Sequence, residues 1–112
     1  MSYNPGEVAE LFGEADAREL LRLASADLTT RLATLRTSLE TDDRTAGARA
    51  AHSMAGVSGN VMAMTLSELA RELEGALRDE TDAPLAVLAE RVTGECDAVI
   101  RTIASHLAGS PA

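Results

Sequence analysis

The sequence predicts an all-α fold: an antiparallel up-down-up-down four-helix bundle with a short extra helix at the N-terminus. Composition is the first observation, because 46% of the 112 residues are hydrophobic but only 2% are aromatic. Alanine and leucine supply most of this hydrophobic content and favour helices, whereas strand-favouring residues are scarce. The second observation is that apolar residues follow the helical period in four long segments joined by short connections. Because the length supports one modest core, we expect residues 1–112 to form a single domain.

The first half of the chain is predicted to hold one short and one long helix. The segment 5–12 forms the short helix, and Gly13 ends it. Its apolar residues share one face: Val8, Leu11 and Phe12. The segment 16–40 forms a long amphipathic helix. Its apolar stripe consists of Leu21, Leu28, Leu32, Leu35 and Leu39. Residues 41–43, Thr-Asp-Asp, end this helix and offer N-cap side chains for the next one.

The second half is predicted to hold three more helices. The segment 44–62 forms one, and the sequence Thr-Leu-Ser-Glu at 65–68 has the form of a capping box that begins the next. Residues 79–82 form a polar turn, Pro84 lies in the first turn of the last helix, and 109–111 end it. The three apolar stripes are Ala50, Met54, Val57 and Val61; Leu66, Leu69, Leu73 and Leu77; and Leu85, Leu88, Val92, Cys96, Val99, Ile103 and Leu107.

The net charge and the cysteine content limit which binding partners and which cellular compartment we expect. The formal net charge is −8, and an acidic surface disfavours nucleic acid and anionic membranes as partners, so we expect protein partners with a basic face. We also expect neither export nor membrane insertion, because the N-terminus has no leader-like pattern and no long apolar run occurs. The chain has a single cysteine, Cys96, so it cannot form an internal disulfide, which fits a reducing compartment. Because Cys96 falls on a core stripe, we expect it to be a buried, inert thiol.

His52 is the residue that points most directly to chemistry. It lies nearly opposite the apolar stripe of its helix and should therefore face solvent. The neighbours expected on its side are small: Ala48, Ala55, Gly56, Gly59 and Ala63. Glycine inside a helix costs about 1 kcal/mol relative to alanine, so a bare face suited to docking another protein's active site is one interpretation. An ordinary surface histidine, with glycines that mark a kink or close helix packing, is an equally supported one.

A motif surrounds this histidine. It reads Ala51-His52-Ser53-Met54-Ala55-Gly56, then Val57-Ser58-Gly59-Asn60, and later Leu66, Leu69 and Leu73-Glu74. It resembles the phosphotransfer-histidine motif of histidine-containing phosphotransfer (HPt) domains, which typically show His-x-(Leu/Ile/Met)-Lys-Gly followed by a Gly-Ala…Leu…Leu-Glu pattern. The upstream Leu11-Phe12-Gly13 and the long helix from Asp16 also resemble the N-terminal half of an HPt domain. The likeness spans about residues 5–108, and its specific part is about 25 residues long.

Two positions depart from the family pattern. The lysine three residues after the histidine is Ala55 here, and the glycine expected before Ala63 is Met62. In the family, that lysine favours phosphoryl binding through its charge, so its absence speaks against efficient transfer unless another cation substitutes for it. Three arginines are candidates by spacing and by resemblance: Arg49, Arg71 and Arg78. The simpler interpretation of each is a solvated surface side chain.

The resemblance implies a bacterial, cytoplasmic phosphorelay carrier that accepts and donates a phosphoryl group on His52. Glu74 would accept a hydrogen bond from Nδ1–H and leave Nε2 as the nucleophile. The partners implied are response-regulator receiver domains, a hybrid histidine kinase, or both. The carrier needs no cofactor of its own, because the receiver brings the Mg²⁺, and it has no kinase activity. Glu74 as a plain solvent-facing glutamate is the alternative interpretation of that residue.

Other interpretations remain open at this point. An HPt-like adaptor could bind a receiver or kinase without transfer, and Ala55 favours that reading. A helical oligomerisation module is a third possibility, although we expect a monomer. His106 is expected to be a plain surface or helix-end histidine, and the two histidines of the chain do not support a bundle metal site. Three methionines are expected to fill the core: Met54, Met62 and Met64.

Overall fold

The computed structural model describes residues 3–79 and 84–109, and every regular element in these ranges is a helix. The predicted all-α class is therefore confirmed. The helices, in chain order, are α1 (Gly6–Phe12), α2 (Glu14–Glu40), α3 (Arg44–Asn60), α4 (Met64–Asp79) and α5 (Leu85–Gly109).

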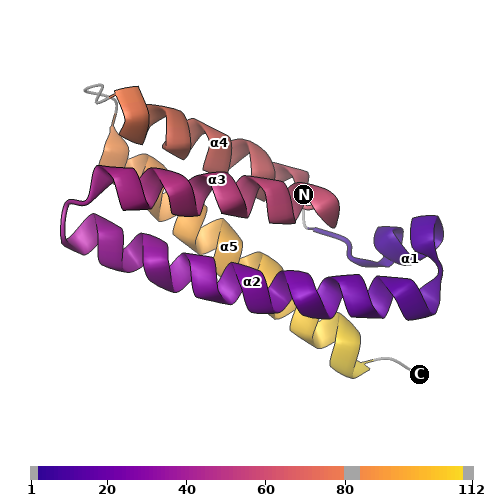
Figure 1. Cartoon of the computed structure of the whole chain (residues 1–112). Helices are drawn as coiled ribbons and strands as arrows, with labels where there is room; N and C mark the ends of the chain where they lie inside the picture. The colour runs from indigo at the N-terminus through magenta and orange to yellow at the C-terminus, as the bar shows by residue number, and fades with distance from the viewer. Residues whose placement is uncertain (1–2, 80–83, 110–112) are drawn as a thin grey trace.

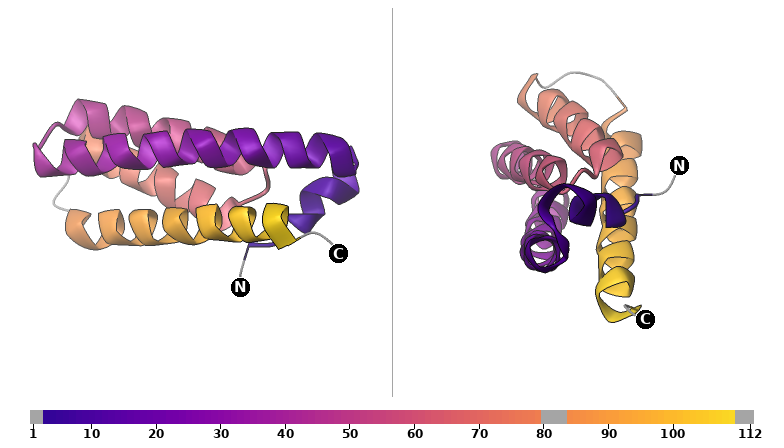
Figure 2. Two further views of the ribbon diagram at one scale, coloured as in Figure 1. Left: turned by 90° about the horizontal axis from the view of Figure 1, so that it is seen from below. Right: turned by 90° about the vertical axis from the view of Figure 1, so that its right-hand side faces the viewer.

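The four long helices close a bundle around one core. Helix α2 packs against α3, α3 against α4, α4 against α5, and α5 back against α2. Consecutive long helices run in opposite directions, so the connectivity is up-down-up-down, and the short α1 packs against α2 (Figures 1 and 2). The expected bundle with an extra N-terminal helix is thus confirmed.

The predicted apolar stripes supply the core. The large side chains that are fully buried are Val8, Leu21, Leu28, Leu35, Met54, Val61, Leu66, Leu73, Val92, Cys96, Val99 and Ile103. Stripe residues at the edges of the bundle stay half-buried, among them Leu39, Val57, Leu69, Leu85, Leu88 and Leu107. Burial raises the pKa of the Cys96 thiol to about 12, and the nearby Asp97 carboxylate adds to this effect. The thiol therefore stays protonated and unreactive at neutral pH.

Helix α2 begins two residues earlier than the apolar stripe predicts. Gly13 has φ 86°, a left-handed conformation that glycine adopts without strain, and its carbonyl accepts from the Ala17 N–H. One glycine therefore ends α1 and opens α2 at Glu14. At its other end α2 stops at Glu40, as predicted, and Asp43 caps α3 by accepting from the Ala46 N–H at 3.1 Å.

The turn between α3 and α4 differs from the prediction. Helix α3 ends at Asn60, because the Met62 N–H bonds to the Gly59 carbonyl and the Ala63 N–H bonds to that of Ser58. This paired pattern is a Schellman motif, which puts the residue after the C-cap Val61 in a left-handed conformation. Met62 is that residue, with φ 65°. The HPt motif has a glycine here, and the positive φ gives a physical reason for it.

The capping box expected at 65–68 is wrong. Helix α4 already begins at Met64, so Thr65 lies inside the helix rather than at its N-cap. The Ser67 N–H bonds to the Ala63 carbonyl as in a regular helix. The buried Ser67 hydroxyl instead donates to the Ala55 carbonyl of α3, at 2.9 Å. The residues that look like a helix cap in the sequence therefore contribute, through Ser67, a hydrogen bond between α4 and α3.

The short helix α1 buries less than its sequence suggests. Of its three apolar residues only Val8 is buried, whereas Leu11 is 65% and Phe12 is 48% exposed. Two of the three apolar side chains of this 7-residue helix therefore stay open to solvent. Nearby, the Tyr3 hydroxyl donates to the Val61 carbonyl at 2.7 Å. Burial, with a further contribution from Glu7, raises the pKa of Tyr3 to about 12.

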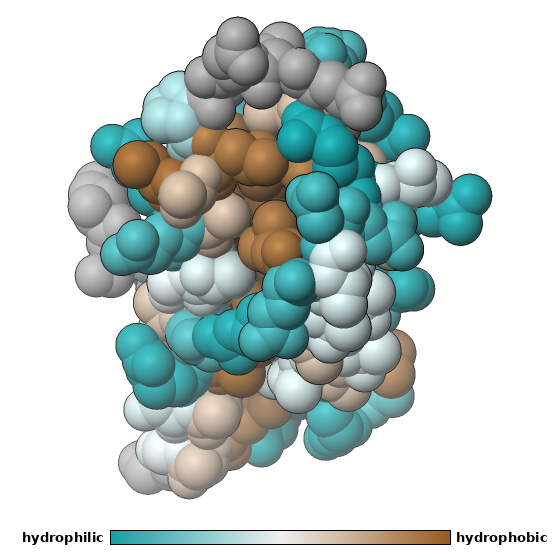
Figure 3. Space-filling model, turned by 90° about the vertical axis from the view of Figure 1, so that its left-hand side faces the viewer, coloured by the Kyte–Doolittle hydropathy of each residue, from teal (hydrophilic) through white to brown (hydrophobic). Residues whose placement is uncertain are grey.

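The two ends of α5 fall close to their predicted places. Pro84 directly precedes the helix, and its carbonyl accepts from the Leu88 N–H at 3.1 Å. Asp79 is the last residue of α4 and Gly109 the last of α5; residues 80–82 of the predicted turn and 110–111 of the predicted end lie outside the described residues. No described helix is long and apolar enough to cross a membrane. The bundle end in Figure 3 is largely hydrophilic, with apolar residues visible between the polar ones.

Candidate functional site

His52 lies in the middle of α3 and is open to solvent. Its side chain is 72% exposed, whereas Met54, two residues further on, is fully buried in the core. The helical period that places the apolar stripe inside the bundle therefore places this imidazole outside it. Solvent exposure, which the sequence predicted, is the first requirement for a side chain that another protein must reach.

Helix α4 holds one side of the imidazole. His52 Nδ1 lies 3.1 Å from Oε1 and 3.2 Å from Oε2 of Glu74, so it donates to this carboxylate when it carries the proton. The Glu74 side chain is only 18% exposed and lies at the boundary between α3 and α4. Nδ1 and Nε2 point out of the ring on roughly opposite sides. Nε2 therefore faces away from α4.

Arg78 holds the Glu74 carboxylate in place through a hydrogen bond. Its Nε donates to Glu74 Oε2 at 2.8 Å, one helical turn along α4. Partial burial by itself would raise the pKa of Glu74, but the hydrogen bonds from Arg78 and His52 outweigh it. The pKa of this carboxyl consequently lies below its usual range. Glu74 is thus ionised at neutral pH and acts as a fixed acceptor for Nδ1–H.

Small residues bring α3 and α4 close enough for this contact. The alanines of α3 that face α4 are almost fully buried: Ala48, Ala51 and Ala55. Further along the same seam, a Cβ added to Gly59 would lie 3.5 Å from the Ser67 hydroxyl. Short side chains let the two helix axes approach, so a glutamate on one helix can reach a histidine on the other.

The bare face expected around His52 is smaller than the sequence suggested. Three of its five predicted members are buried and cannot belong to it: Ala48, Ala55 and Ala63. Gly59 is half-buried beside α4, which matches the close-packing interpretation of the glycines. Of these five residues, Gly56 alone is exposed, and a Cβ built on it would meet nothing within 4 Å. The error arose because alanines flanking His52 on the helical wheel turn toward α4.

Two of the three candidate arginines lie beside His52. Arg49 and Arg78 line a hollow of about 460 Å³ together with Arg31 of α2, and we call it the arginine hollow. Its lining residues are Arg31, Thr34, Ala46, Arg49, Ala50, His52, Ser53 and Arg78. Arg71 is exposed one turn before Glu74 and does not line this hollow. Because α3 and α4 are antiparallel, Arg71 lies on the side of His52 toward Gly56.

Arg31 is the residue that sequence reasoning missed. It belongs to α2 and precedes the turn at 41–43 by about as many residues as His52 follows it. In an antiparallel helix pair, residues at equal distances from the turn lie side by side. This register was the available signal, and it becomes usable only once the pairing of the two helices is known.

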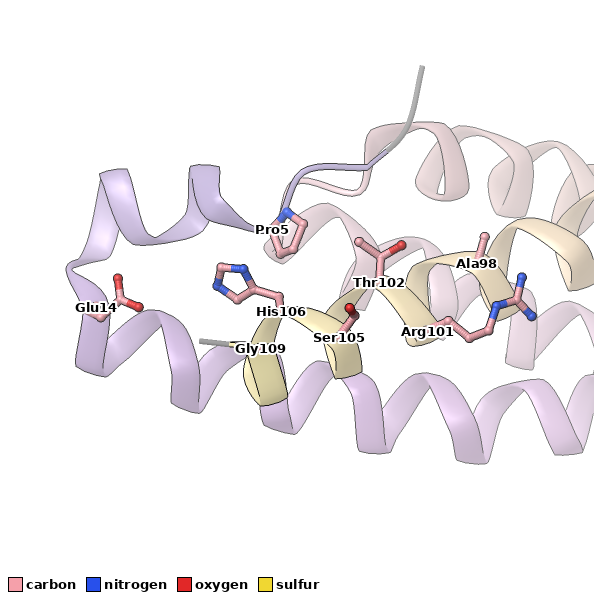
Figure 4. Close-up of a pocket in the computed structure, with 8 residues that line it drawn as sticks. All are labelled: Pro5, Glu14, Ala98, Arg101, Thr102, Ser105, His106 and Gly109. Atoms are coloured by element: carbon pink, nitrogen blue, oxygen red, sulfur yellow. The ribbon is translucent and has the colours of Figure 1, made fainter. Parts of the chain in front are cut away.

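The second histidine, His106, lies in a different setting near the end of α5. It lines an open hollow of about 900 Å³ with Glu14, Arg101 and Ser105 (Figure 4). Within residues 3–79 and 84–109, no side-chain hydrogen bond holds its ring, and no three His, Cys, Asp or Glu residues gather as a metal site would require.

Comparisons with known proteins identify the family of this chain. A family model described as the Hpt domain matches residues 19–103, which is most of the chain. The chain belongs to the Hpt domain family. The resemblance inferred from the sequence motif is therefore confirmed, and the family supports a phosphotransfer role in a phosphorelay. Members of this family generally interact with receiver domains and kinases of two-component relays.

A solved structure extends the likeness over nearly the whole chain. The crystal structure of histidine-containing phosphotransfer protein B (HptB) from Pseudomonas aeruginosa PAO1 aligns with a TM-score of 0.80 at 25% identity. The match covers 96% of this chain and 92% of that one, so the short α1 and all four long helices fall within the shared architecture. No curated protein matches the chain significantly.

Proposed function

We propose that this Hpt protein accepts a phosphoryl group on Nε2 of His52 and passes it on, exchanging it with the aspartates of receiver domains. The observation that carries the proposal is the contact between His52 Nδ1 and Glu74, at 3.1 Å, on an imidazole that is 72% exposed. This contact favours the tautomer with the proton on Nδ1. The lone pair of Nε2 is then free for attack from the solvent side.

The transfer step needs little from this chain. The Nε2 lone pair attacks phosphorus in line, the Nε2–P bond forms, and the P–O bond to the receiver aspartate breaks. The aspartate leaves as a carboxylate, and the imidazole gains positive charge while Nδ1 keeps its proton. The ionised Glu74, held by Arg78 at 2.8 Å, offsets that charge. Mg²⁺ is expected on the receiver, and the reverse step returns the phosphoryl group to an aspartate.

The surface around His52 fits the approach of another protein. Gly56 lies one turn after His52 and leaves open space above α3. Exposed arginines flank His52: Arg49 and Arg78 lie on one side of it and Arg71 on the other. Acidic side chains that surround a receiver's phosphorylation site would complement these guanidinium groups. Ala55 and Gly59 contribute beneath this surface by keeping α3 close to α4, rather than by touching the partner.

The remaining features of the proposal follow from the relay role. The whole chain, 1–112, acts as one monomeric HPt domain in the bacterial cytoplasm. Its partners are receiver domains, a hybrid histidine kinase, or both, and nucleic acid and membranes are not among them. It carries a phosphoryl group without kinase activity of its own.

The deciding experiment is phosphoryl transfer from a panel of labelled receiver domains. We expect acid-labile, alkali-stable label on the wild type and none on His52→Gln. His106→Gln is the matched control, because it removes the other histidine of the chain and should leave transfer unchanged. Label that persists on His52→Gln would show that His52 is not the acceptor. Analytical ultracentrifugation of the same samples tests the monomer and would reveal an oligomerisation module.

Ala55 favours a second candidate function, a non-transferring adaptor. This residue occupies the place of the family lysine and is almost completely buried against α4, so it supplies no charge to His52. An adaptor would bind a receiver, measured by calorimetry, but take up no label from it. Ala55→Lys is then the informative variant, because restored transfer would trace the defect to the missing charge.

A further inference from the structure

The arginine hollow lies beside His52 and draws one cation from each of three helices. Arg31 comes from α2, Arg49 from α3 and Arg78 from α4. The chain as a whole is acidic, with a net charge of −8, and all ten of its basic residues are arginines. Three of the ten therefore gather at one hollow next to His52, the histidine that Glu74 holds. Local charge at this place is opposite in sign to that of the protein.

The three guanidinium groups differ in whether a carboxylate of the chain already pairs with them. Arg31 pairs with Asp27 at 3.2 Å, and Arg78 pairs with Glu74 at 2.8 Å. In the part of the chain that the structure describes, no carboxylate lies within 4.0 Å of Arg49. Arg49 is thus the cation with most capacity for a new anion. Arg31 is about two-fifths exposed and can turn from Asp27 toward one.

Ring geometry relates the hollow to the reacting atom. Nδ1 is turned to α4 and Glu74, so Nε2 is on the side of the ring away from α4. The hollow extends from His52 over the groove between α2 and α3, and Thr34 and Ser53 add hydroxyl groups to it. A phosphoryl group on Nε2 would carry up to two negative charges and three acceptor oxygens. Guanidinium groups bind such oxygens in bidentate fashion.

We propose that the arginine hollow binds the phosphoryl group carried on Nε2, with Arg49 as its principal ligand and Arg31 as the second. This inference rests on the proposed function. The proposal places the positive charge that binds the phosphoryl group on the α2 side of the imidazole. A lysine at position 55 would instead extend from the contact between α3 and α4. The missing family lysine is then replaced by residues of a different helix pair.

The test uses phosphoramidate as a small phosphoryl donor, so that no receiver domain affects the result. In this reaction the P–N bond of the donor breaks, the Nε2–P bond forms and ammonia leaves. We expect Arg49→Gln to slow the labelling of His52 about 5-fold, the effect of losing one exposed charge pair. Arg31→Gln should slow it less, and the double variant should be slower than either.

A second readout reports the phosphoryl group directly. ³¹P NMR titration of the labelled protein follows the protonation of the phosphoryl group on Nε2 and gives its pKa. Nearby arginines hold it down, so we expect Arg49→Gln to raise it by about 0.5 units. Arg101→Gln is the matched control, because it removes an exposed arginine that lines the distant hollow beside His106. It should change neither the rate nor the titration.

The outcomes separate this inference from the proposed function. If the wild type is labelled on His52 and both arginine variants behave like Arg101→Gln, the hollow is not the phosphoryl site and the carrier role stands. If neither phosphoramidate nor any receiver labels His52, the carrier role fails and the phosphoryl site fails with it. Circular dichroism melting of each variant checks that the bundle is intact.

Discussion

The two histidines of this protein occupy contrasting surroundings. His52 lies on an exposed helix face, where Glu74 of the neighbouring helix accepts from Nδ1 and Arg78 fixes the carboxylate. His106 is more enclosed and lines the larger hollow, yet no hydrogen bond from the described residues orients its ring. The size of a hollow is therefore a poor guide to chemistry in this bundle. A second helix that supplies an ionised carboxylate at the right register is what sets His52 apart.

Removing the Glu74 carboxylate should have the largest effect, because it removes the contact that orients His52 and that His106 lacks among the described residues. We expect Glu74→Ala to lower the rate of phosphoryl transfer to His52 by about 10-fold or more, because the imidazole loses its fixed tautomer. Glu14→Ala is the matched control, since Glu14 lines the hollow beside His106. ¹⁵N NMR of the imidazole supplies a readout that a purely structural role would not move. The proton should sit on Nδ1 in the wild type and be shared between both nitrogens in Glu74→Ala. Unchanged transfer in that variant would remove Glu74 from the mechanism.

The exposed glycine one turn after His52 has a counterpart on α5, far from the proposed site. Gly56 of α3 and Gly94 of α5 are both exposed helical glycines, and a Cβ meets nothing within 4 Å at either one. Replacing either by leucine should raise the free energy of unfolding by about 0.5–1 kcal/mol, because glycine is a poor helix former. Only Gly56→Leu should weaken receiver binding, by about 10-fold, since overfilling a packed interface costs about 1–3 kcal/mol.

The readouts for this pair are urea unfolding and calorimetric titration with a receiver domain. Two stabilised variants with different affinities would show that Gly56 is kept for docking and not for the fold. Equal affinities would move the docking surface elsewhere on the molecule.

The smallest expected effect concerns the pH dependence of stability. The pKa of Glu74 is lower in the folded protein than its ordinary value of 4.5, because the hydrogen bonds from Arg78 and His52 outweigh partial burial. A lowered pKa means that the unfolded chain binds the proton more readily. The stabilising contribution of Glu74 is therefore complete above about pH 4.5 and is lost as the pH falls through the lowered pKa.

Urea unfolding of the wild type and Glu74→Gln between pH 3 and 7 measures this contribution. The difference in unfolding free energy should be largest at neutral pH and should shrink below about pH 4.5. A difference that grows toward acid pH would mean that the carboxyl is destabilised in the folded state and is not held by its two partners.

The helical period alone predicted much of the fold. The stripes around Leu28, Met54, Leu73 and Cys96 were sufficient to define four helices with one buried face each, because side-chain direction along a helix is fixed locally. The same local rule predicted that His52 faces solvent. The helix boundaries were less accurate, and Ser67 shows why. Its hydroxyl bonds to Ala55 on another helix, a contact that no local pattern encodes.

The candidate site depended more on tertiary structure. The motif resemblance, not the spacing, pointed to Glu74 as the partner of His52. Spacing failed for Ala48 and Ala55, which flank His52 on a helical wheel but are buried once α4 packs against them. It also missed Arg31, whose place beside His52 requires the register between α2 and α3.

The sequence by itself thus determined the all-α class, the buried stripes and an outward-facing His52, since these follow from the geometry of a single helix. The tertiary structure decided which carboxylate meets Nδ1, which small residues disappear into the α3–α4 seam, and which arginines surround the imidazole. The physical reason is that a helix fixes directions only relative to its own axis. Contacts between helices depend on their separation and register, which the packing of the whole core sets.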